Sequence, residues 1–339
     1  MTAETLQHPR DGLSIVVPLF NEATGLPVLH GKLMEMCARL AAAHGLKTEV
    51  VYVDDGSRDN TLAVARGLPA SSASVQTVSL SRNFGKEAAL LAGLDVARLG
   101  AVMFMDGDGQ HPPELAEKLV ALWRVDGYDV VYTAKANRDN EPLLRRLFAK
   151  LFYGVLNFNA RAPIPEDAGD FRLLSPRAVE ALRKLPERNR FFKGLSSWIG
   201  FKQVRVPYEP APRAHGVTNW NMRALLGLSI EGITAFSAAP LRIASLLGLL
   251  LSGTAFLFGL WILAETLILG KNVPGYPSVI VGIMVIGGVQ LLVLGVIGEY
   301  IAKILSELKR RPSYFVAEHE TREAGEKPVP EKSPREAAE

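Results

Sequence analysis

The sequence is poor in cysteine, because Cys37 is the only one among its 339 residues. A single thiol cannot form a disulfide bond within its own chain, so disulfide bonds do not hold this fold together. We expect Cys37 to be a small buried apolar residue in a helix, which is the ordinary role of a free cysteine. The cysteine content therefore fits a reducing compartment.

An excess of charge of one sign is also lacking. The 38 Lys and Arg residues nearly balance the 35 Asp and Glu residues, and the formal net charge is +3. With 48% hydrophobic and 22% charged residues, the composition excludes a disordered or collagen-like chain. No segment combines a basic stripe with aromatic residues, so we expect no nucleic-acid partner. Residues 1–10 form a polar N-terminal tail without the apolar core of a signal peptide, and we expect the domain after it to stay in the cytoplasm.

Two long segments lack charge altogether. They cover Ile243–Leu263 and Pro277–Gly298, and each has roughly the 20 residues that a helix needs to cross a membrane. Both segments are apolar on every face, which argues against a helical hairpin buried in a soluble protein. We therefore expect two transmembrane helices within residues 241–302, at about 243–264 and 277–300.

The charges that flank these segments predict their orientation. The link between them carries only Glu265 and Lys271, whereas several basic residues precede the first segment or follow the second. By the positive-inside rule, both termini lie in the cytoplasm. From Glu318 onward the sequence has no apolar period, and we expect residues 303–339 to form a basic and then disordered tail. Residues 143–158 and a juxtamembrane segment at 221–240 show amphipathic helical patterns, which fit either a membrane surface or the domain core.

Residues 11–220 form the predicted catalytic domain, in which short β-rich runs alternate with helical stretches. This order predicts an α/β fold with a mostly parallel sheet and helices on both faces. Ligands bind such sheets at the carboxyl ends of the strands. The predicted strands are Leu13–Pro18, Thr48–Asp54, Val75–Ser81, Ala101–Asp106 and Asp129–Thr133, and the predicted helices lie near 25–43, 59–67, 86–98 and 113–125.

Polar residues follow each of the first four predicted strands. Asp106 and Asp108 leave the fourth strand with Gly107 between them, a spacing that suits either Mg²⁺ or Mn²⁺ bridging to phosphate, or a solvated turn. Asp54 and Asp55 end the second strand, where a carboxylate can accept from a base N–H or a ribose hydroxyl, or where nearby residues can cap a helix. The first strand ends in Pro18, Asn21 and Glu22, and Arg82 and Lys86 after the third form a candidate diphosphate site at a helix start.

Five motifs occur in the order VVPLFNE, VDDGS, SRNFGKE, DGDGQHPPE and GDFRLL. As a set they resemble the inverting glycosyltransferases of family 2 with the GT-A fold. The closer resemblance is to the polyprenyl-phosphate branch, which includes dolichol-phosphate mannose synthase and the bactoprenol glucosyltransferases, and it covers about residues 11–315. It implies a Rossmann-like GT-A domain followed by two transmembrane helices, located in a bacterial inner membrane.

The resemblance also implies roles for individual residues. Glu22 and Asp55, with Asp54 nearby, would hold the uridine of a nucleotide sugar, in a site that also includes Pro18, Asn21 and Gly107. Arg82 and Lys86 would lie near the diphosphate, and Asp106 and Asp108 would bind Mg²⁺ or Mn²⁺ with Gln110 beside the metal.

Asp170 matches the acidic residue that is often proposed as the catalytic base. A phosphate acceptor is already ionised near neutral pH, so we favour a role for Asp170 in orienting the sugar or the acceptor. Arg172, Arg190 and Arg213 are the residues that we expect to bind the acceptor phosphate. Asn219 stands where related sequences often have a lysine, so we assign it no phosphate.

These inferences predict an enzyme that moves a hexose, glucose from UDP-glucose in the first instance, to undecaprenyl phosphate and so makes a lipid-linked sugar for cell-envelope glycans. GDP-mannose, UDP-GlcNAc and UDP-aminoarabinose remain alternative donors, and a non-catalytic nucleotide-binding scaffold remains an alternative class. A processive polysaccharide synthase is disfavoured because no Q-x-x-R-W segment occurs. Glycines at 282, 287, 288 and 295 permit close helix packing, and the resemblance suggests a homo-oligomer, specifically a tetramer.

Overall fold

The computed structural model describes residues 12–109, 111–112, 114–135, 153–154, 157, 164–165, 168–185, 187, 192–208, 239–269 and 275–326. The chain divides into two compact units, one comprising Met1–Leu147, Ala162–Asn219 and Pro312–Glu339, the other Phe148–Arg161 and Trp220–Arg311. The predicted site residues Gln110, Arg190 and Arg213 lie outside the described residues. So do the two amphipathic segments, apart from residues 153–154, 157 and 239–240.

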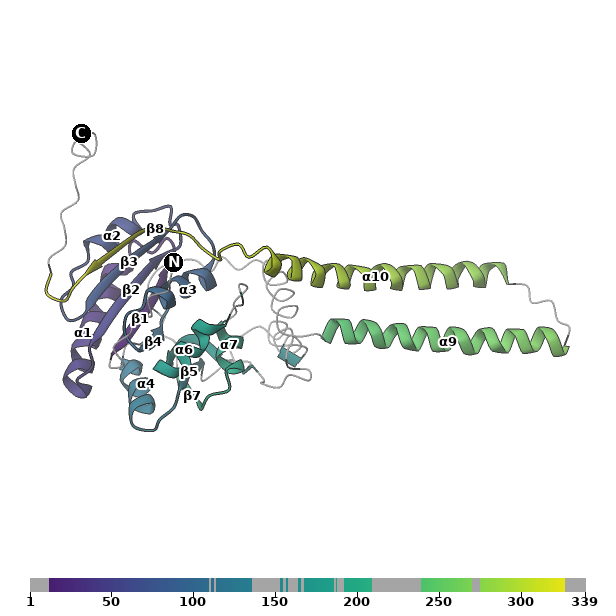
Figure 1. Ribbon diagram of the computed structural model, residues 1–339, viewed down its shortest axis with the longest axis horizontal. Helices are drawn as coiled ribbons and strands as arrows, with labels where there is room; N and C mark the ends of the chain where they lie inside the picture. The colour runs from purple at the N-terminus through teal and green to yellow at the C-terminus, as the bar shows by residue number, and fades with distance from the viewer. Residues whose placement is uncertain are drawn as a thin grey trace, which may run out of the picture. The chain divides into compact units, whose positions relative to one another are not determined.

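The first unit is built on an eight-stranded mixed sheet with the strand order β7-β5-β6-β4-β1-β2-β3-β8 (Figure 1). β4, β1, β2 and β3 run parallel to their neighbours in this set, and β5 runs parallel to β7, whereas β6 and β8 are antiparallel to theirs. The predicted α/β fold is confirmed, but the last three strands along the chain were not predicted. The strands are β1 (Leu13–Leu19), β2 (Thr48–Asp54), β3 (Ser74–Leu80), β4 (Ala101–Phe104), β5 (Val130–Lys135), β6 (Ala168–Leu174), β7 (Gln203–Tyr208) and β8 (Val316–Arg322).

Helices cover both faces of this sheet (Figure 1). Ile15 and Val17 of β1 belong to the core with Leu33 of α1, whereas Val16 points to the opposite face because strand side chains alternate. There it meets α3, where a Cβ on Gly93 would lie 2.2 Å from a Val16 methyl carbon, so this helix packs closely on the sheet only with glycine at that position. The helices are α1 (Leu26–His44), α2 (Thr61–Gly67), α3 (Lys86–Val96), α4 (Glu114–Arg124), α6 (Pro176–Lys184) and α7 (Phe192–Trp198).

The second unit contains two long helices, α9 (Ala239–Leu269) and α10 (Tyr276–Leu308). Within them, Pro240–Ile262 and Gly282–Leu308 are long and apolar enough to cross a membrane, judged by length and composition. Large apolar side chains are exposed along both helices, among them Leu249 in α9 and Met284 in α10. α9 extends beyond the predicted span of 243–264 at both ends, and α10 continues past the predicted end at residue 300 to Leu308.

The prediction of a disordered tail from Glu318 is wrong for the residues up to Glu326. β8 pairs with β3, with His319 opposite Val78, because its charged side chains find partners on the first unit. Glu318 and Glu320 both pair with Arg66 of α2. Arg322 is buried and donates to the carbonyl oxygen of Leu68 at 2.6 Å. A charged sequence without an apolar period can therefore form an edge strand when its charges are matched.

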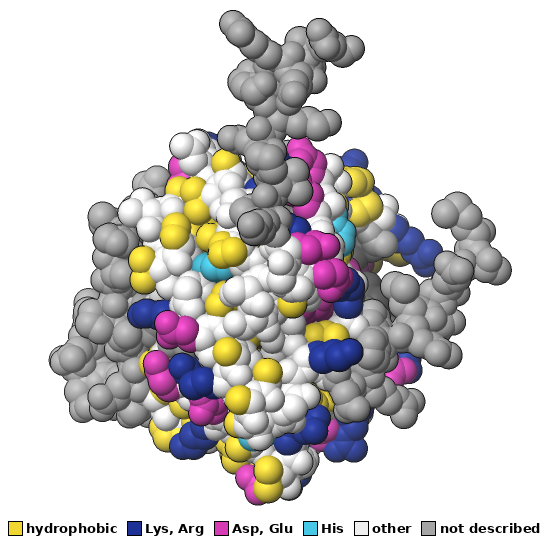
Figure 2. All heavy atoms as spheres, turned by 90° about the vertical axis from the view of Figure 1, so that its left-hand side faces the viewer, with side chains coloured by type: hydrophobic (Ala, Val, Ile, Leu, Met, Phe, Trp, Pro, Cys, Tyr) yellow, Lys and Arg dark blue, Asp and Glu magenta, His cyan; other side chains and the backbone are white. Residues whose placement is uncertain are grey.

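The face of the first unit that carries α1 and α2 has mixed charge (Figure 2). Acidic and basic side chains are intermingled there with exposed apolar ones. One pair on this side of the sheet joins two helices, since Arg39 of α1 lies 2.6 Å from Glu117 of α4. The described side chains on this face therefore do not gather into a patch of one sign.

Candidate active site

The carboxyl ends of β4, β1, β2 and β3 lie side by side, because these strands are adjacent and parallel. β6 runs antiparallel to β4 with Arg172 opposite Phe104, and the same register continued by two residues brings Asp170 level with Asp106. The sheet therefore brings the predicted site residues of four motifs, and Asp170 of the fifth, to one edge. They are Pro18, Asn21, Glu22, Asp54, Asp55, Arg82, Lys86, Asp106, Gly107, Asp108 and Asp170.

An ammonium group lies between two carboxylates at this edge. Lys86 is the first residue of α3, and its Nζ lies 2.5 Å from Asp106 Oδ1 and 2.6 Å from Asp170 Oδ2. Lys193 lies 3.2 Å from Asp170 Oδ1. Burial raises the pKa of Asp170, but the charges of Lys193 and Lys86 outweigh it and hold that pKa well below its usual range. The edge thus offers carboxylates to a cation and ammonium groups to an anion.

Asp106 and Asp108 fit a divalent cation. His111 contacts the start of this pair, because its Nδ1 lies 3.3 Å from the backbone nitrogen of Asp106. Burial lowers the pKa of His111, and the charges of Asp106 and Asp108 act against that change. A Cβ on Gly107 would come within 3.0 Å of the Pro18 carbonyl oxygen, so glycine is required between them. Among the described residues no cluster of three or more His, Cys, Asp or Glu surrounds one point. A Mg²⁺ or Mn²⁺ ion held by this pair would therefore take substrate phosphate and water as its other ligands.

Asp55 holds the loop that leads into α3. Its two oxygens accept the N–H groups of Phe84 at 2.7 Å and Gly85 at 2.9 Å. Burial raises the pKa of Asp55, and these two hydrogen bonds act against that rise. Gly56 has φ of 68°, and a Cβ there would lie 2.6 Å from the backbone carbon of Arg82. The turn after β2 is thus packed directly against the loop after β3.

Two residues expected to contact the nucleotide have side chains engaged within the protein. Asn21 has a left-handed backbone with φ of 58°; its N–H donates to Ser57 Oγ at 2.9 Å and its Oδ1 accepts the N–H of Arg58 at 2.8 Å. Both oxygens of Asp54 lie 3.3 Å from the N–H of Ser57, which they accept. The Asn21 contacts join the turn after β1 to the turn after β2, and the Asp54 contacts stabilise the turn after β2 itself.

Arg172 has a different place from the one expected. Its side chain is buried, and its guanidinium donates to the carbonyl oxygens of Gly169 at 2.7 Å and Phe192 at 3.2 Å and to the hydroxyl of Ser196. A buried guanidinium needs such acceptors, because an unpaired buried charge is costly. The structure therefore gives Arg172 a role in bracing α7 on β6 instead of the expected role of binding the acceptor phosphate.

His111 is a neighbour of the acidic pair that the sequence analysis did not single out. Its Nδ1 accepts the N–H of Asp106 at 3.3 Å, and its ring centroid lies 4.9 Å from that of Phe171 and 5.7 Å from that of Tyr208. An imidazole that accepts at Nδ1 carries its proton at Nε2. The available signal was the position of His111 in the DGDGQH motif, shortly after the acidic pair.

Glu87 is a second residue that the sequence analysis missed. Burial and then the charge of Asp170 raise the pKa of Glu87 to about 7. Its Oε2 accepts the N–H of Phe192 at 3.1 Å, which joins the start of α3 to the start of α7. The signal was again its motif, since Glu87 directly follows Lys86 in SRNFGKE.

An acidic pair after a central strand, a lysine at a helix start and two connected loops are features that suit a phosphate-bearing substrate and a divalent cation. Residues 14–183 match the family model described as Glycosyl transferase family 2. An uncharacterized glycosyltransferase of Synechocystis sp. is 42% identical over 306 residues, which cover 90% of this chain and 95% of that protein. The bactoprenol glucosyl transferase of Shigella phage SfII is 41% identical over 304 residues, which cover 90% and 97%.

Among solved structures, the mannosyl-3-phosphoglycerate synthase of Rubrobacter xylanophilus has 20% identity and a TM-score of 0.43, and the alignment covers 70% of this chain and 75% of that one. The family match and the two relatives establish the family. This chain belongs to glycosyl transferase family 2 and is a glycosyltransferase. The resemblance inferred from the five motifs is thereby confirmed.

Proposed function

We propose that this glycosyltransferase moves glucose from UDP-glucose to undecaprenyl phosphate, with inversion at the anomeric carbon. The observation that carries the proposal is the Lys86 ammonium between Asp106 and Asp170 at the carboxyl edge of the sheet. The chain that holds this site also contains two helices apolar enough to cross a membrane. Relatives named bactoprenol glucosyl transferase support glucose as the sugar and a lipid-linked acceptor.

We assign the donor diphosphate to the start of α3. The first turn of a helix presents free N–H groups and a partial positive charge, to which Lys86 and the neighbouring Arg82 add full charges. Asp106 and Asp108 would hold Mg²⁺ or Mn²⁺, which when bound neutralises charge on the departing UDP. Glu22 and Asp55 follow the adjacent strands β1 and β2, where we place the uridine.

The transfer step needs no general base on the protein. A phosphate monoester has its second pKa near about 6, so the acceptor oxygen is already ionised at neutral pH. Asp170 contacts both Lys86 and Lys193, and we assign it to positioning these two cations. Lys86 can then stabilise the negative charge that develops on the leaving diphosphate. Attack on the face opposite that diphosphate inverts the anomeric centre.

We place α9 and α10 in a bacterial cytoplasmic membrane. Their apolar side chains are exposed on the protein, with Leu249 at 71% and Phe256 at 70%, and lipid would remove this surface from water. The link between the helices carries only Glu265 and Lys271, whereas Lys303 and Lys309 follow in the last part of α10 and just after it. The positive-inside rule then puts the catalytic unit and both termini in the cytoplasm.

A donor panel tests the proposal. The protein, purified in mild detergent with Mn²⁺, is incubated with UDP-glucose, UDP-GlcNAc or GDP-mannose, each with and without undecaprenyl phosphate, and nucleotide release is followed. We expect release from UDP-glucose that depends on the lipid phosphate. Lipid-dependent release from a different donor would contradict the assignment of glucose, and no release from any donor would contradict this acceptor.

A further inference from the structure

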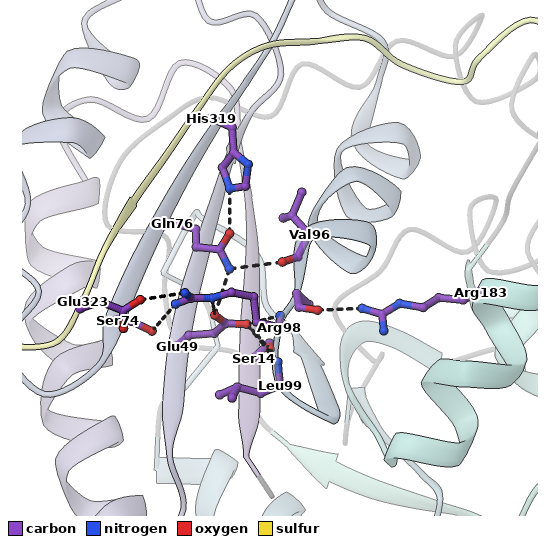
Figure 3. A network of polar contacts seen from close by, with 11 residues as sticks. Ser14, Glu49, Ser74, Gln76, Val96, Arg98, Leu99, Arg183, His319 and Glu323 are labelled. Atoms are coloured by element: carbon purple, nitrogen blue, oxygen red, sulfur yellow. Dashed lines mark hydrogen bonds and ion pairs between the residues drawn. The ribbon is translucent and has the colours of Figure 1, made fainter. Parts of the chain in front are cut away.

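A polar network centred on the buried residues Glu49 and Gln76 fixes β8 to the catalytic sheet (Figure 3). His319 of β8 shares a hydrogen bond of 2.8 Å with Gln76 Oε1 of β3, and Gln76 Nε2 donates to Glu49 Oε2 at 2.9 Å. Glu49 also accepts from Arg98 Nε at 3.0 Å, and Arg98 Nη1 donates to Glu323 Oε1 at 2.7 Å. The network thus begins and ends on the C-terminal segment and crosses the fully buried Glu49 between them.

The residue before β8 contacts the loop that leads into α3. The N–H of Ser81 donates to the carbonyl oxygen of Phe315 at 2.9 Å. The rings of Phe84 and Phe315 lie 6.3 Å apart between centroids, with an interplanar angle of 53°. On the same ring, the guanidinium carbon of Arg82 lies 4.6 Å from the Phe84 centroid. Phe84 is therefore in contact with both Phe315 and a residue assigned to the donor diphosphate.

Two further contacts hold the loop before α3 and the segment before β8 in place. The Phe84 N–H is held by Asp55 at 2.7 Å, so the backbone of Phe84 is fixed from β2 while its ring meets Phe315. Tyr314 Oη donates to Asp95 Oδ2 at 2.7 Å, near the end of α3. The consecutive residues Tyr314 and Phe315 thus contact the end of α3 and the loop before its start.

We propose that Phe315 is a positioning residue for the donor: its ring, anchored by β8, holds Phe84 and with it the Arg82–Lys86 loop in the conformation that binds the diphosphate. The inference rests on the proposed donor site. Phe315 follows α10 closely along the chain, so the donor site depends on a residue from beyond the second apolar helix. The segment that follows the second apolar helix thereby becomes a determinant of donor affinity.

The test compares Phe315→Ala with two other variants. An aromatic pair of this kind corresponds to about a fivefold change in an equilibrium constant. We expect Phe315→Ala to raise the Kd for UDP, measured calorimetrically with Mn²⁺, and the KM for UDP-glucose by about fivefold. The kcat and the KM for undecaprenyl phosphate should stay within about twofold, because uniform binding is what is lost. Phe315→Tyr keeps the ring and should restore both donor constants.

Val316→Ala is the matched control, because Val316 is the next residue and is also exposed, at 42% against 56% for Phe315. We expect wild-type donor constants for this variant. Unchanged donor constants in Phe315→Ala would overturn the inference, and so would an equal rise in Val316→Ala, which would assign the effect to strand pairing. If the wild-type protein transfers glucose and binds UDP, the variants test the role of Phe315 alone. If the wild-type protein binds no UDP, the proposed donor is refuted as well.

Discussion

Replacing Lys86 with methionine removes the cation between Asp106 and Asp170 while keeping an unbranched side chain. The ammonium makes two charge-assisted contacts, at 2.5 and 2.6 Å. Without it, two neighbouring carboxylates repel each other, and of the two lysines near Asp170 only Lys193 remains. We therefore expect Lys86→Met to lower both the rate of glucosyl transfer and the stability of the fold.

The structure sets the size of the two losses. A hydrogen bond to a charged group contributes about 1.5–3 kcal/mol. The Lys86 side chain is 42% exposed and each carboxylate 26%, so screening by solvent reduces the two contacts together to about 1–2 kcal/mol of stability. The kinetic loss is larger, about 100-fold in kcat, because the ammonium stabilises charge that develops in the transition state. Lys86→Arg keeps the charge but replaces a compact ammonium with a planar fork, so we expect an intermediate loss of about tenfold.

The assay follows UDP release at saturating undecaprenyl phosphate, with thermal unfolding of the same samples in detergent. Lys184→Met is the matched control, because Lys184 makes an exposed ion pair of 2.8 Å with Glu180 one helical turn away in α6. The control should keep wild-type turnover. A Lys86→Met turnover within about threefold of the wild type would refute the assignment of Lys86 to the leaving diphosphate.

Three further substitutions test the fold around the site. Glu49→Gln should lower the free energy of unfolding, measured by denaturant titration, by about 2–4 kcal/mol. The new amide N–H would face N–H and O–H groups of Ser14 and Arg98 that now donate to the carboxylate. An unchanged unfolding midpoint would contradict the role of this network. Glu87→Gln should stabilise the protein by roughly 1–3 kcal/mol at about pH 8 and little near about pH 5. The folded pKa of Glu87, about 7, lies above its usual 4.5, so the wild type loses stability as the pH rises between these two values. Equal shifts in melting temperature at both pH values would count against this prediction. Gly56→Ala should lower the melting temperature clearly more than Gly45→Ala. Both glycines have a positive φ, 68° and 61°, which costs an alanine about 1–2 kcal/mol, but only the Cβ at Gly56 would meet a backbone atom, at 2.6 Å. Equal losses of melting temperature would argue against the close packing of this turn.

The parallel half of the sheet could be predicted because its strands carry their own signal. β1 and β2 are buried and mostly apolar, as strands covered on both faces must be, with Ser14 and Glu49 among the polar exceptions near their starts. The polar residues of the site motifs follow where these strands end. The observed β1 to β4 begin at, or within one residue of, their predicted starts. Because parallel strands end at the same edge, the acidic and basic motifs could be assigned to one site without knowledge of any contact.

β6 and β8 could not be predicted in this way because their stability comes from partners distant in sequence. The strand β8 is charged, and its pairing depends on Arg66 for its glutamates and on Gln76 for His319. The role of Arg172 in β6 was misjudged for a related reason. The GDFRLL motif indicates a cation near the site, but only the fold shows that Arg172 donates to a carbonyl oxygen of Gly169 and to groups of α7.

The most direct test of the account is the mass of the lipid product. Wild-type protein and Asp108→Asn are each incubated with Mn²⁺, UDP-glucose and undecaprenyl phosphate, and the extracted lipid is analysed by mass spectrometry, with circular dichroism as a check that both proteins are folded. The account predicts undecaprenyl phosphate heavier by one hexose residue with the wild type and unmodified lipid with Asp108→Asn. Unmodified lipid from a folded, UDP-binding wild type, or an equal yield of product from Asp108→Asn, would contradict it.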